Sequence, residues 1–255
     1  RYPEKRIMIL ASCSYMLQPL IHALRRAGIP FHNPYRTKNG AWNPLKRSTK
    51  DQISTLDRLL AYVSQVPAEH EEEDALPFAL NYIDASEFLK WYEIIKAAGN
   101  IPRSLKNKII EDLRRWIDGG GSMLPAEDVR AFFEEDCGIW DYWGNPGRVN
   151  EAIEWFVKNI PSDKARVLEF PQTIIQKKGV QALKAPPQVI VGTIHSVKGG
   201  EADVVYVIPD ISYNAYAGKI NSCAGHDAVI RLKYVAYTRA RESLVLLDSA
   251  SSMTM

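Results

Sequence analysis

Short apolar segments near both ends of this chain limit its fold more than any other feature of the sequence. Residues 7–11 read IMILA, and similar segments cover 188–191, 203–208 and 243–247. A continuously apolar strand is typical of a parallel sheet whose two faces are both covered. These segments therefore predict an α/β domain built on a parallel sheet.

The residues after the first apolar segment predict a strand–helix–strand unit. Apolar residues recur at helical spacing from 17 to 24, Ser14 is placed to cap this helix, and Gly28 is placed to end it. A second strand is predicted at 29–32. Further helices are predicted at 171–179, between Pro171 and Gly179, and at 227–241.

The middle of the chain shows helical periodicity in place of the α/β pattern. Three apolar faces recur there, formed by Ile53, Leu56, Leu59, Leu60 and Val63, by Leu105, Ile109, Leu113 and Trp116, and by Ile153, Phe156 and Val157. Breaks are predicted at 69–74 and 119–121. The sequence thus predicts a discontinuous parallel α/β domain over 1–50 and 166–255, with an all-helical inserted subdomain over 51–165.

The charge distribution supports this division. The net charge is +2 for the whole chain, but +9 for residues 1–50, −10 for 51–165 and +3 for 166–255. The basic segments are the better candidates for contact with phosphate groups. Solvated surfaces of opposite sign would give the same numbers, so charge alone leaves both interpretations open.

Composition excludes several classes of protein. No apolar run approaches the ~18 residues of a membrane-spanning helix, and the first residues do not form a signal peptide. Three scattered cysteines fit a reducing cytoplasm. Cys223 and His226 form at most half of a zinc site, so no metal site is predicted. The first residue is not Met, which indicates a fragment of a longer protein.

Residues 193–202 (TIHSVKGGEA) follow a predicted strand and contain several groups that bind nucleotides. Ligands of open α/β sheets bind at the carboxyl ends of strands, where this loop is expected. Gly199 and Gly200 allow a close backbone approach, and Glu201 is suited to accept from a ribose hydroxyl. Four side chains are suited to donate to phosphates: Thr193, His195, Ser196 and Lys198. A surface turn remains the alternative interpretation.

Residues 234–241 (YVAYTRAR) place several cationic side chains on the predicted helix 227–241. Arg231, Tyr234, Thr238 and Arg241 fall near one another at three- and four-residue spacing, and Arg239 is offset from them. An Arg on such a helix is suited to contact a transferring γ-phosphoryl group as an arginine finger. A surface ion pair is the alternative.

These segments together resemble the superfamily 1 DNA helicases of the UvrD/Rep/PcrA type. Residues 193–201 resemble motif V of that family, 235–240 resemble motif VI, and 7–24 are similar to motif IV. The resemblance implies a second RecA-like domain with its helical insertion, the 2A and 2B regions. It also implies 3′→5′ movement along DNA driven by ATP.

The resemblance implies a role for each matching residue. Arg239 would be the γ-phosphate-sensing finger, Glu201 would contact the ribose, and Gly199 and Gly200 would lie beside the nucleotide. DNA contacts would come from Thr193, His195, Ser196, Lys198, Tyr213, Tyr216 and Arg36. Gln18 stands where motif IV has a second phosphate-contacting Arg, so Arg239 would act alone or with a cation such as Arg36.

The phosphate-binding loop and the Mg²⁺-binding Asp-Glu motif of that family do not occur in this sequence. ATP and Mg²⁺ would therefore need the N-terminal RecA-like domain of the same protein, and the isolated chain is expected to be inactive. Single-stranded or duplex DNA is the other expected partner, as in a DNA repair helicase, with no membrane. The alternative is a nucleic-acid-binding or regulatory module that is derived from a helicase and does not hydrolyse ATP.

Overall fold

The computed structural model describes residues 5–36, 42–48, 52–66, 81–96, 103–133, 139, 142 and 147–255. The chain forms two compact units. The first unit combines residues 1–45 with 173–255, and the second contains 46–172. The sequence pattern predicts the boundaries between the units after residue 50 and after residue 165.

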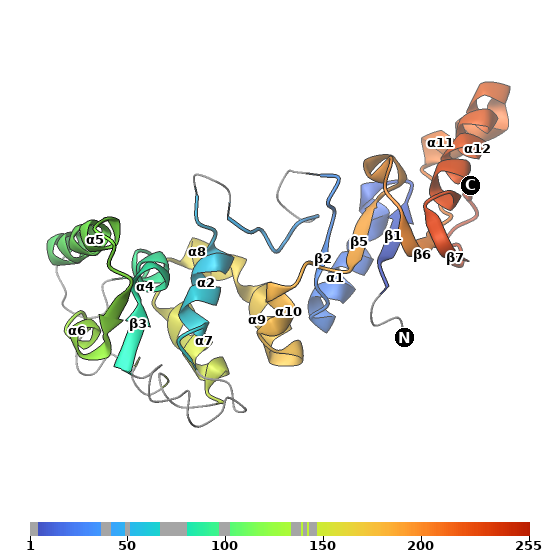
Figure 1. The fold of residues 1–255 in the computed structure, drawn as a ribbon. Helices are drawn as coiled ribbons and strands as arrows, with labels where there is room; N and C mark the ends of the chain where they lie inside the picture. The colour runs from blue at the N-terminus through green and yellow to red at the C-terminus, as the bar shows by residue number, and fades with distance from the viewer. Residues whose placement is uncertain are drawn as a thin grey trace. The chain divides into compact units, whose positions relative to one another are not determined.

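A five-stranded parallel sheet forms the centre of the first unit (Figure 1). Its strands lie in the order β2-β5-β1-β6-β7, and each neighbouring pair is parallel. The strands are β1 (Ile7–Ala11), β2 (Phe31–His32), β5 (Val189–Thr193), β6 (Ala202–Val207) and β7 (Ala240–Leu246). The α/β fold with a parallel sheet, predicted from the apolar segments, is confirmed.

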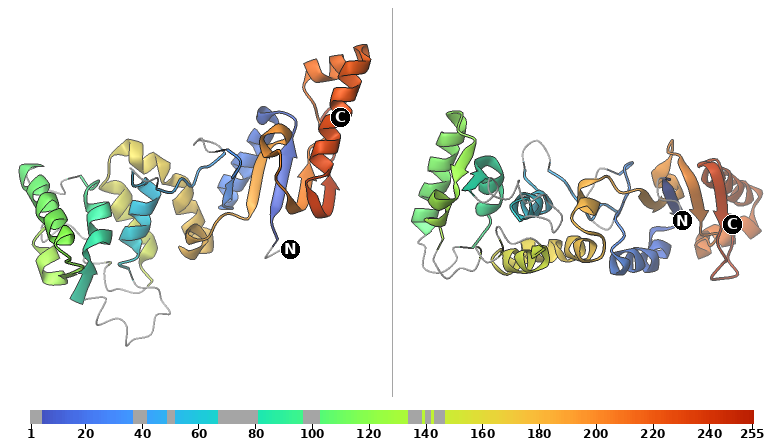
Figure 2. Two further views of the ribbon diagram at one scale, coloured as in Figure 1. Left: turned by 45° about the horizontal axis from the view of Figure 1, so that its top comes forward. Right: turned by 60° about the horizontal axis from the view of Figure 1, so that its bottom comes forward.

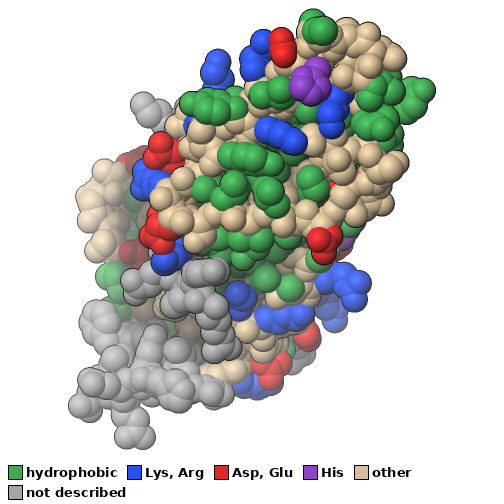
Figure 3. Space-filling model, turned by 90° about the vertical axis from the view of Figure 1, so that its right-hand side faces the viewer, with side chains coloured by type: hydrophobic (Ala, Val, Ile, Leu, Met, Phe, Trp, Pro, Cys, Tyr) green, Lys and Arg blue, Asp and Glu red, His purple; other side chains and the backbone are tan. Residues whose placement is uncertain are grey.

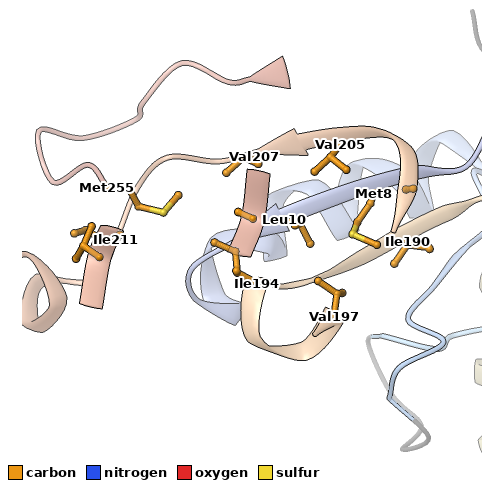
Figure 4. Packing of buried hydrophobic residues seen from close by; sticks show 12 residues of the cluster. Met8, Leu10, Ile190, Ile194, Val197, Val205, Val207, Ile211 and Met255 are labelled. Atoms are coloured by element: carbon orange, nitrogen blue, oxygen red, sulfur yellow. The ribbon is translucent and has the colours of Figure 1, made fainter. Parts of the chain in front are cut away.

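A hydrophobic cluster covers one face of this sheet. It joins β1, β5 and β6 to a 3₁₀ helix, η4 (Ile194–Val197), and to α12 (Cys223–Tyr237). Figure 4 shows η4 next to the strands, with Ile194 and Val197 pointing toward them. Burying one Val, Leu, Ile or Met side chain stabilises the fold by about 1.5–3 kcal/mol. The cluster consists of Met8, Leu10, Ile190, Ile194, Val197, Ala202, Val205, Val207, Ile211, Val229, Ala236 and Met255.

The connection from β1 to β2 contains a 3₁₀ helix, η1 (Ser14–Leu17), followed by α1 (Gln18–Ala27). The prediction that Ser14 caps the α-helix is wrong, because Ser14 is the first residue of η1. Pro19 lies in the first turn of α1, where its fixed φ fits and no backbone hydrogen bond is lost. Gly28 ends α1 with a φ of 64°, as predicted.

α11 (Tyr213–Asn221) and α12 lie side by side and are joined by Ser222 alone (Figure 2). Ser222 caps α12, since its Oγ accepts a hydrogen bond from Gly225 N at 3.0 Å. The two helices are very close, because a Cβ on Gly225 would lie 2.1 Å from the carbonyl oxygen of Gly218. The close approach therefore depends on glycine at this position.

The last residues of the chain pack against the residues that follow β6. Asp210 is only 6% exposed, and its carboxylate accepts hydrogen bonds from Ser249 Oγ (3.2 Å), Ser251 Oγ (2.6 Å) and Ala250 N (3.1 Å). Burial raises the pKa of Asp210, but these hydrogen bonds favour the charged form and lower the pKa overall. The segment also places Met255 in the hydrophobic cluster.

The second unit contains helices and a short antiparallel pair of strands. β3 (Tyr82–Asp84) pairs with β4 (Met123–Pro125), so the prediction of an all-helical insertion is wrong in this respect. Strands of three residues are too short to give an alternating pattern. Its described helices include α2 (Thr55–Val63), α4 (Ala85–Tyr92), α5 (Arg103–Asp118), α6 (Ala126–Arg130), α7 (Val149–Lys158) and α8 (Ser162–Val167).

Two further helices follow α8 in the chain before β5. α9 (Glu169–Lys178) begins two residues before the predicted start at Pro171, and α10 (Gln181–Lys184) follows it. Gly179 ends α9 with a φ of 77°, as predicted. None of the helices in the described part of the chain is long and apolar enough to cross a membrane.

Aromatic side chains form much of the core of the second unit. Tyr62 and Trp91 pack edge-to-face with ring centroids 5.1 Å apart, and Phe88 packs on Trp91 at 4.9 Å. The predicted apolar faces of α2 and α7 are largely buried, as Leu59 and Phe156 show. Such aromatic pairs contribute about 0.5–1.5 kcal/mol beyond their buried area.

Parts of the predicted apolar faces are exposed. Ile53 precedes α2 and is 40% exposed, and Leu105 and Trp116 on α5 are 47% and 40% exposed. Only Leu113 of that face is buried, because α5 packs through a narrower stripe than its spacing suggests. α5 ends before Gly119, as predicted, while the break predicted at 69–74 lies outside the described residues.

Candidate functional site

The connection from β5 to β6 carries most of the predicted site residues. It leaves the sheet after Thr193, forms η4, and returns through residues 198–201 to the start of β6. Because both strands run parallel to β1, this path crosses from the carboxyl edge of the sheet to the amino edge. The prediction that the whole segment lies at the carboxyl edge is wrong, since Glu201 lies at the amino edge.

The polar side chains of this connection differ in exposure. His195 and Lys198 are exposed, whereas Thr193 is 8% exposed. Ser196 Oγ donates to the carbonyl oxygen of Thr193 at 2.8 Å and accepts from Asn33 Nδ2 at 3.1 Å. His195 and Lys198 are therefore accessible to a ligand, while Thr193 and Ser196 shape the connection.

Asn33, directly after β2, is a fully buried polar residue that no sequence motif singles out. Besides its bond to Ser196, Asn33 Nδ2 donates to the carbonyl oxygen of Val191 at 3.2 Å. Its Oδ1 accepts from Tyr35 N at 3.1 Å, and its backbone N donates to Asn43 Oδ1 at 2.8 Å. A buried amide with these partners fixes the turn after β2. The Asn-Pro pair signals a turn, but no local pattern signals the burial.

Three glycines of β5 and the connection allow this arrangement for two different reasons. Gly199 has a φ of 83°, which a residue with a Cβ rarely adopts. A Cβ on Gly192 would lie 2.5 Å from Asn33 Nδ2, and one on Gly200 would lie 2.2 Å from Tyr35 Cζ. The turn after β2 thus packs against two positions that have no side chain.

Arg239 lies in the turn between α12 and β7, and Arg241 lies on β7. Their predicted position on a helix is wrong, because residues 240–246 pair with β6. Arg239 Nε donates to Val235 O (2.9 Å), Nη1 to Gly200 O (3.0 Å) and Nη2 to Thr238 Oγ1 (3.0 Å). Three of the five N–H donors of the guanidinium are thereby used, and the group is held in place.

Glu201 and Arg241 form an ion pair beside Arg239. Arg241 Nε donates to Glu201 Oε2 at 2.9 Å, and about half of each side chain is exposed. The hydrogen bond with Glu201 and its negative charge raise the pKa of Arg241. Because Ala202 N also donates to Arg239 O at 3.0 Å, the structure brings residues 200–202 and 239–241 together.

This group of side chains has a clear chemical capacity. Guanidinium groups bind phosphate oxygens through charge-assisted hydrogen bonds, and a carboxylate accepts from sugar hydroxyls. Arg239 and Arg241 are suited to the first task and Glu201 to the second. The amino edge of β6 and β7 is thus a candidate site for an anionic nucleotide.

Other predicted site residues lie elsewhere in the first unit. Gln18 is exposed at the start of α1, beyond the carboxyl end of β1, and so at the opposite edge of the sheet from Glu201. Arg36 is exposed, with its guanidinium 5.0 Å from the centroid of the Trp42 ring. Tyr213 and Tyr216 lie on α11 rather than in a loop: Tyr213 is 71% exposed, and Tyr216 packs on the hydrophobic cluster.

Cys223 and His226 lie in the first turn of α12, and both are exposed. Among the residues that the structure describes, no group of three or more His, Cys, Asp or Glu side chains is arranged to hold a metal ion. The structure therefore adds no ligand to this pair.

Comparison of the chain with models of known protein families gives no match, and neither does comparison with curated protein sequences. Any assignment of function therefore depends on the motif residues and on the geometry described above.

Proposed function

We propose that this chain is the C-terminal portion of an ATP-dependent DNA helicase or translocase of superfamily 1. It would supply the second RecA-like domain (2A-like) with an inserted subdomain (2B-like). The observation that carries the proposal is the contact of residues 200–202 with 239–241 at the amino edge of β6 and β7. These segments resemble motifs V and VI, which contribute to one nucleotide site in that family, and in this fold they are neighbours.

In this proposal Arg239 stabilises the charge that develops on the γ-phosphoryl group. Its three hydrogen bonds fix the guanidinium before the reaction, so little reorganisation is needed, which is the condition for effective electrostatic catalysis. Glu201 would accept from the ribose, and Arg241, released from Glu201, would face the phosphates. The phosphate-binding loop and the Mg²⁺ ligands would come from the N-terminal RecA-like domain, where ATP and Mg²⁺ would bind.

The same connection would couple the nucleotide to DNA. His195 and Lys198 are exposed and lie only a few residues before Glu201. A shift of this connection when ATP binds would therefore move His195 and Lys198 together with Glu201. Tyr213, exposed on α11, would offer a ring on which a base of single-stranded DNA stacks.

Exposed hydrophobic side chains on α12 and β7 support a partner domain. Ile230 and Tyr234 are 50% and 70% exposed on α12, and Leu244 and Leu246 are 39% and 53% exposed on β7. Figure 3 looks onto this end of the first unit and shows hydrophobic groups between scattered Lys and Arg. Contiguous exposed apolar surface marks interaction sites, and the N-terminal RecA-like domain is the partner that the proposal requires.

The test compares Arg239→Ala with Arg26→Ala in the full-length protein. Arg26 is exposed on α1 and serves as a matched control. We expect Arg239→Ala to lower DNA-stimulated ATP turnover by ~10³-fold or more while ADP and single-stranded DNA still bind, and Arg26→Ala to change none of these. The isolated chain should hydrolyse no ATP. Unchanged turnover in Arg239→Ala would refute the assignment.

A non-hydrolysing nucleic-acid-binding or regulatory module is the second candidate. Two observations favour it: Gln18 stands where the family has a cation, and internal hydrogen bonds already use three of the five N–H donors of Arg239. The two candidates differ in the domain that precedes this chain. An intact phosphate-binding loop and Asp-Glu motif there would indicate a motor, and their decay would indicate a binding module.

A further inference from the structure

We infer that Tyr35 is a positioning residue for the Glu201–Arg241 pair, and that residue 200 is glycine because the Tyr35 ring occupies the space of its side chain. A Cβ at position 200 would lie 2.2 Å from Tyr35 Cζ and 2.3 Å from the phenol oxygen. A Cβ there would displace the end of the Tyr35 side chain, which is 40% exposed, from its place on residue 200. The ring and the missing side chain are therefore complementary.

The backbone gives no other reason for glycine at this position. Gly199 needs its positive φ, whereas Gly200 is not among the glycines with a positive φ. Gly200 is buried although Glu201 beside it is exposed. The Tyr35 ring, from the turn after β2, and the Arg239 guanidinium both lie against Gly200.

The backbone of Tyr35 is held by the turn after β2. Its backbone N donates to Asn33 Oδ1 at 3.1 Å, and Asn33 is fully buried and bonded to β5 and η4. The backbone position of Tyr35 is thus tied to the sheet, and its half-exposed ring lies against Gly200. Tyr35 is also among the groups that raise the pKa of Arg241, after Glu201 and Asp203.

The consequence for activity rests on the proposed function. If the Tyr35 ring is removed, residues 199–201 gain freedom, and Glu201 and Arg241 no longer leave the sheet in one fixed direction. Glu201 would contact the ribose in the ground state and in the transition state alike. Loss of such uniform binding raises KM and leaves kcat nearly unchanged.

The first experiment uses the chain itself and does not depend on catalysis. The Nε–H resonance of Arg241 reports on its bond to Glu201 and is followed by NMR in Tyr35→Phe, Tyr35→Ala, Gly200→Leu and Tyr35→Ala/Gly200→Leu. We expect the resonance to stay in place in Tyr35→Phe, to move in both other single variants, and to return toward its original position in the double variant. An unmoved resonance in Tyr35→Ala, or equal changes in Tyr35→Phe and Tyr35→Ala, would overturn the inference.

The second experiment measures ATP turnover by the full-length protein. We expect Tyr35→Ala to raise KM for ATP by about 10-fold, which corresponds to one positioned hydrogen bond, with kcat within about 3-fold of the parent. Tyr35→Phe should keep KM within about 2-fold of the parent. A lower kcat at unchanged KM would contradict a positioning role through Glu201. Absence of turnover in the parent protein would refute the proposed function, and the NMR result would then decide the inference alone.

Discussion

The contact between α11 and α12 leads to a prediction in which the same substitution has opposite effects at two neighbouring glycines. A Cβ on Gly225 would lie 2.1 Å from Gly218 O, 2.4 Å from Gly218 C and 3.0 Å from Gly218 Cα, all of them backbone atoms that cannot rotate away. A Cβ on Gly218 would meet nothing closer than Gly225 Cα at 3.9 Å, an ordinary contact. Only the first position requires glycine.

The expected magnitudes follow from this geometry. Ordinary contact begins at 3.4 Å, so Gly225→Ala must separate the two helices locally by about 1.3 Å. Overpacking of this kind costs roughly 1–3 kcal/mol, while the better helix propensity of Ala returns at most about 1 kcal/mol. Gly218→Ala keeps the propensity gain without the clash. We therefore expect Gly225→Ala to destabilise the packed pair of helices α11 and α12 by about 1–2 kcal/mol. Gly218→Ala should stabilise the same pair by up to about 1 kcal/mol.

Native-state hydrogen exchange measures this effect locally, which suits a chain of two units. The free energy of opening is obtained for amides of α11 and α12 in both variants and in the parent. Amides of α5 in the second unit serve as an internal control and should not change. Equal protection of α11 in the two variants would show that the backbone contact does not limit the packing. Since α11 carries Tyr213, weaker single-stranded DNA binding should accompany the loss in Gly225→Ala.

Two further predictions concern the pH dependence of stability. The pKa of Asp210 is lowered in the folded state, so its carboxylate contributes stability above the ordinary pKa of about 4, and this contribution is lost as the pH falls below that value. Urea unfolding should show that Asp210→Asn is less stable than the parent at pH 7. The difference in stability should shrink toward pH 2. Burial raises the pKa of Tyr92 to about 12, so its neutral form contributes stability below pH ~10, and this contribution is lost between about pH 10 and 12. Absorbance titration should show one tyrosine that ionises near pH 12, and Tyr92→Phe should remove this transition. An unchanged pH profile in either variant would contradict the corresponding argument.

The helix predicted at 227–241 ends earlier than the local sequence pattern indicates. No glycine or proline separates Tyr237 from Ala240, so local propensity gives no reason to end the helix there. The helix ends because residues 240–246 pair with β6, a partner more than thirty residues earlier in the chain. That pairing moves Arg239 into a turn, and its guanidinium then reaches Gly200.

The sequence by itself determined the parallel α/β class, a buried strand at 7–11, the end of α1 at Gly28, and the two segments with nucleotide-binding residue types. These features follow from periodicity, from glycine geometry and from residue chemistry, which are all local. The tertiary structure decided which edge of the sheet Glu201 occupies, that Glu201 pairs with Arg241, and that Asn33 and Tyr35 support the connection between β5 and β6. Those contacts join residues that are far apart in the chain, and only strand order and packing bring them within bonding distance.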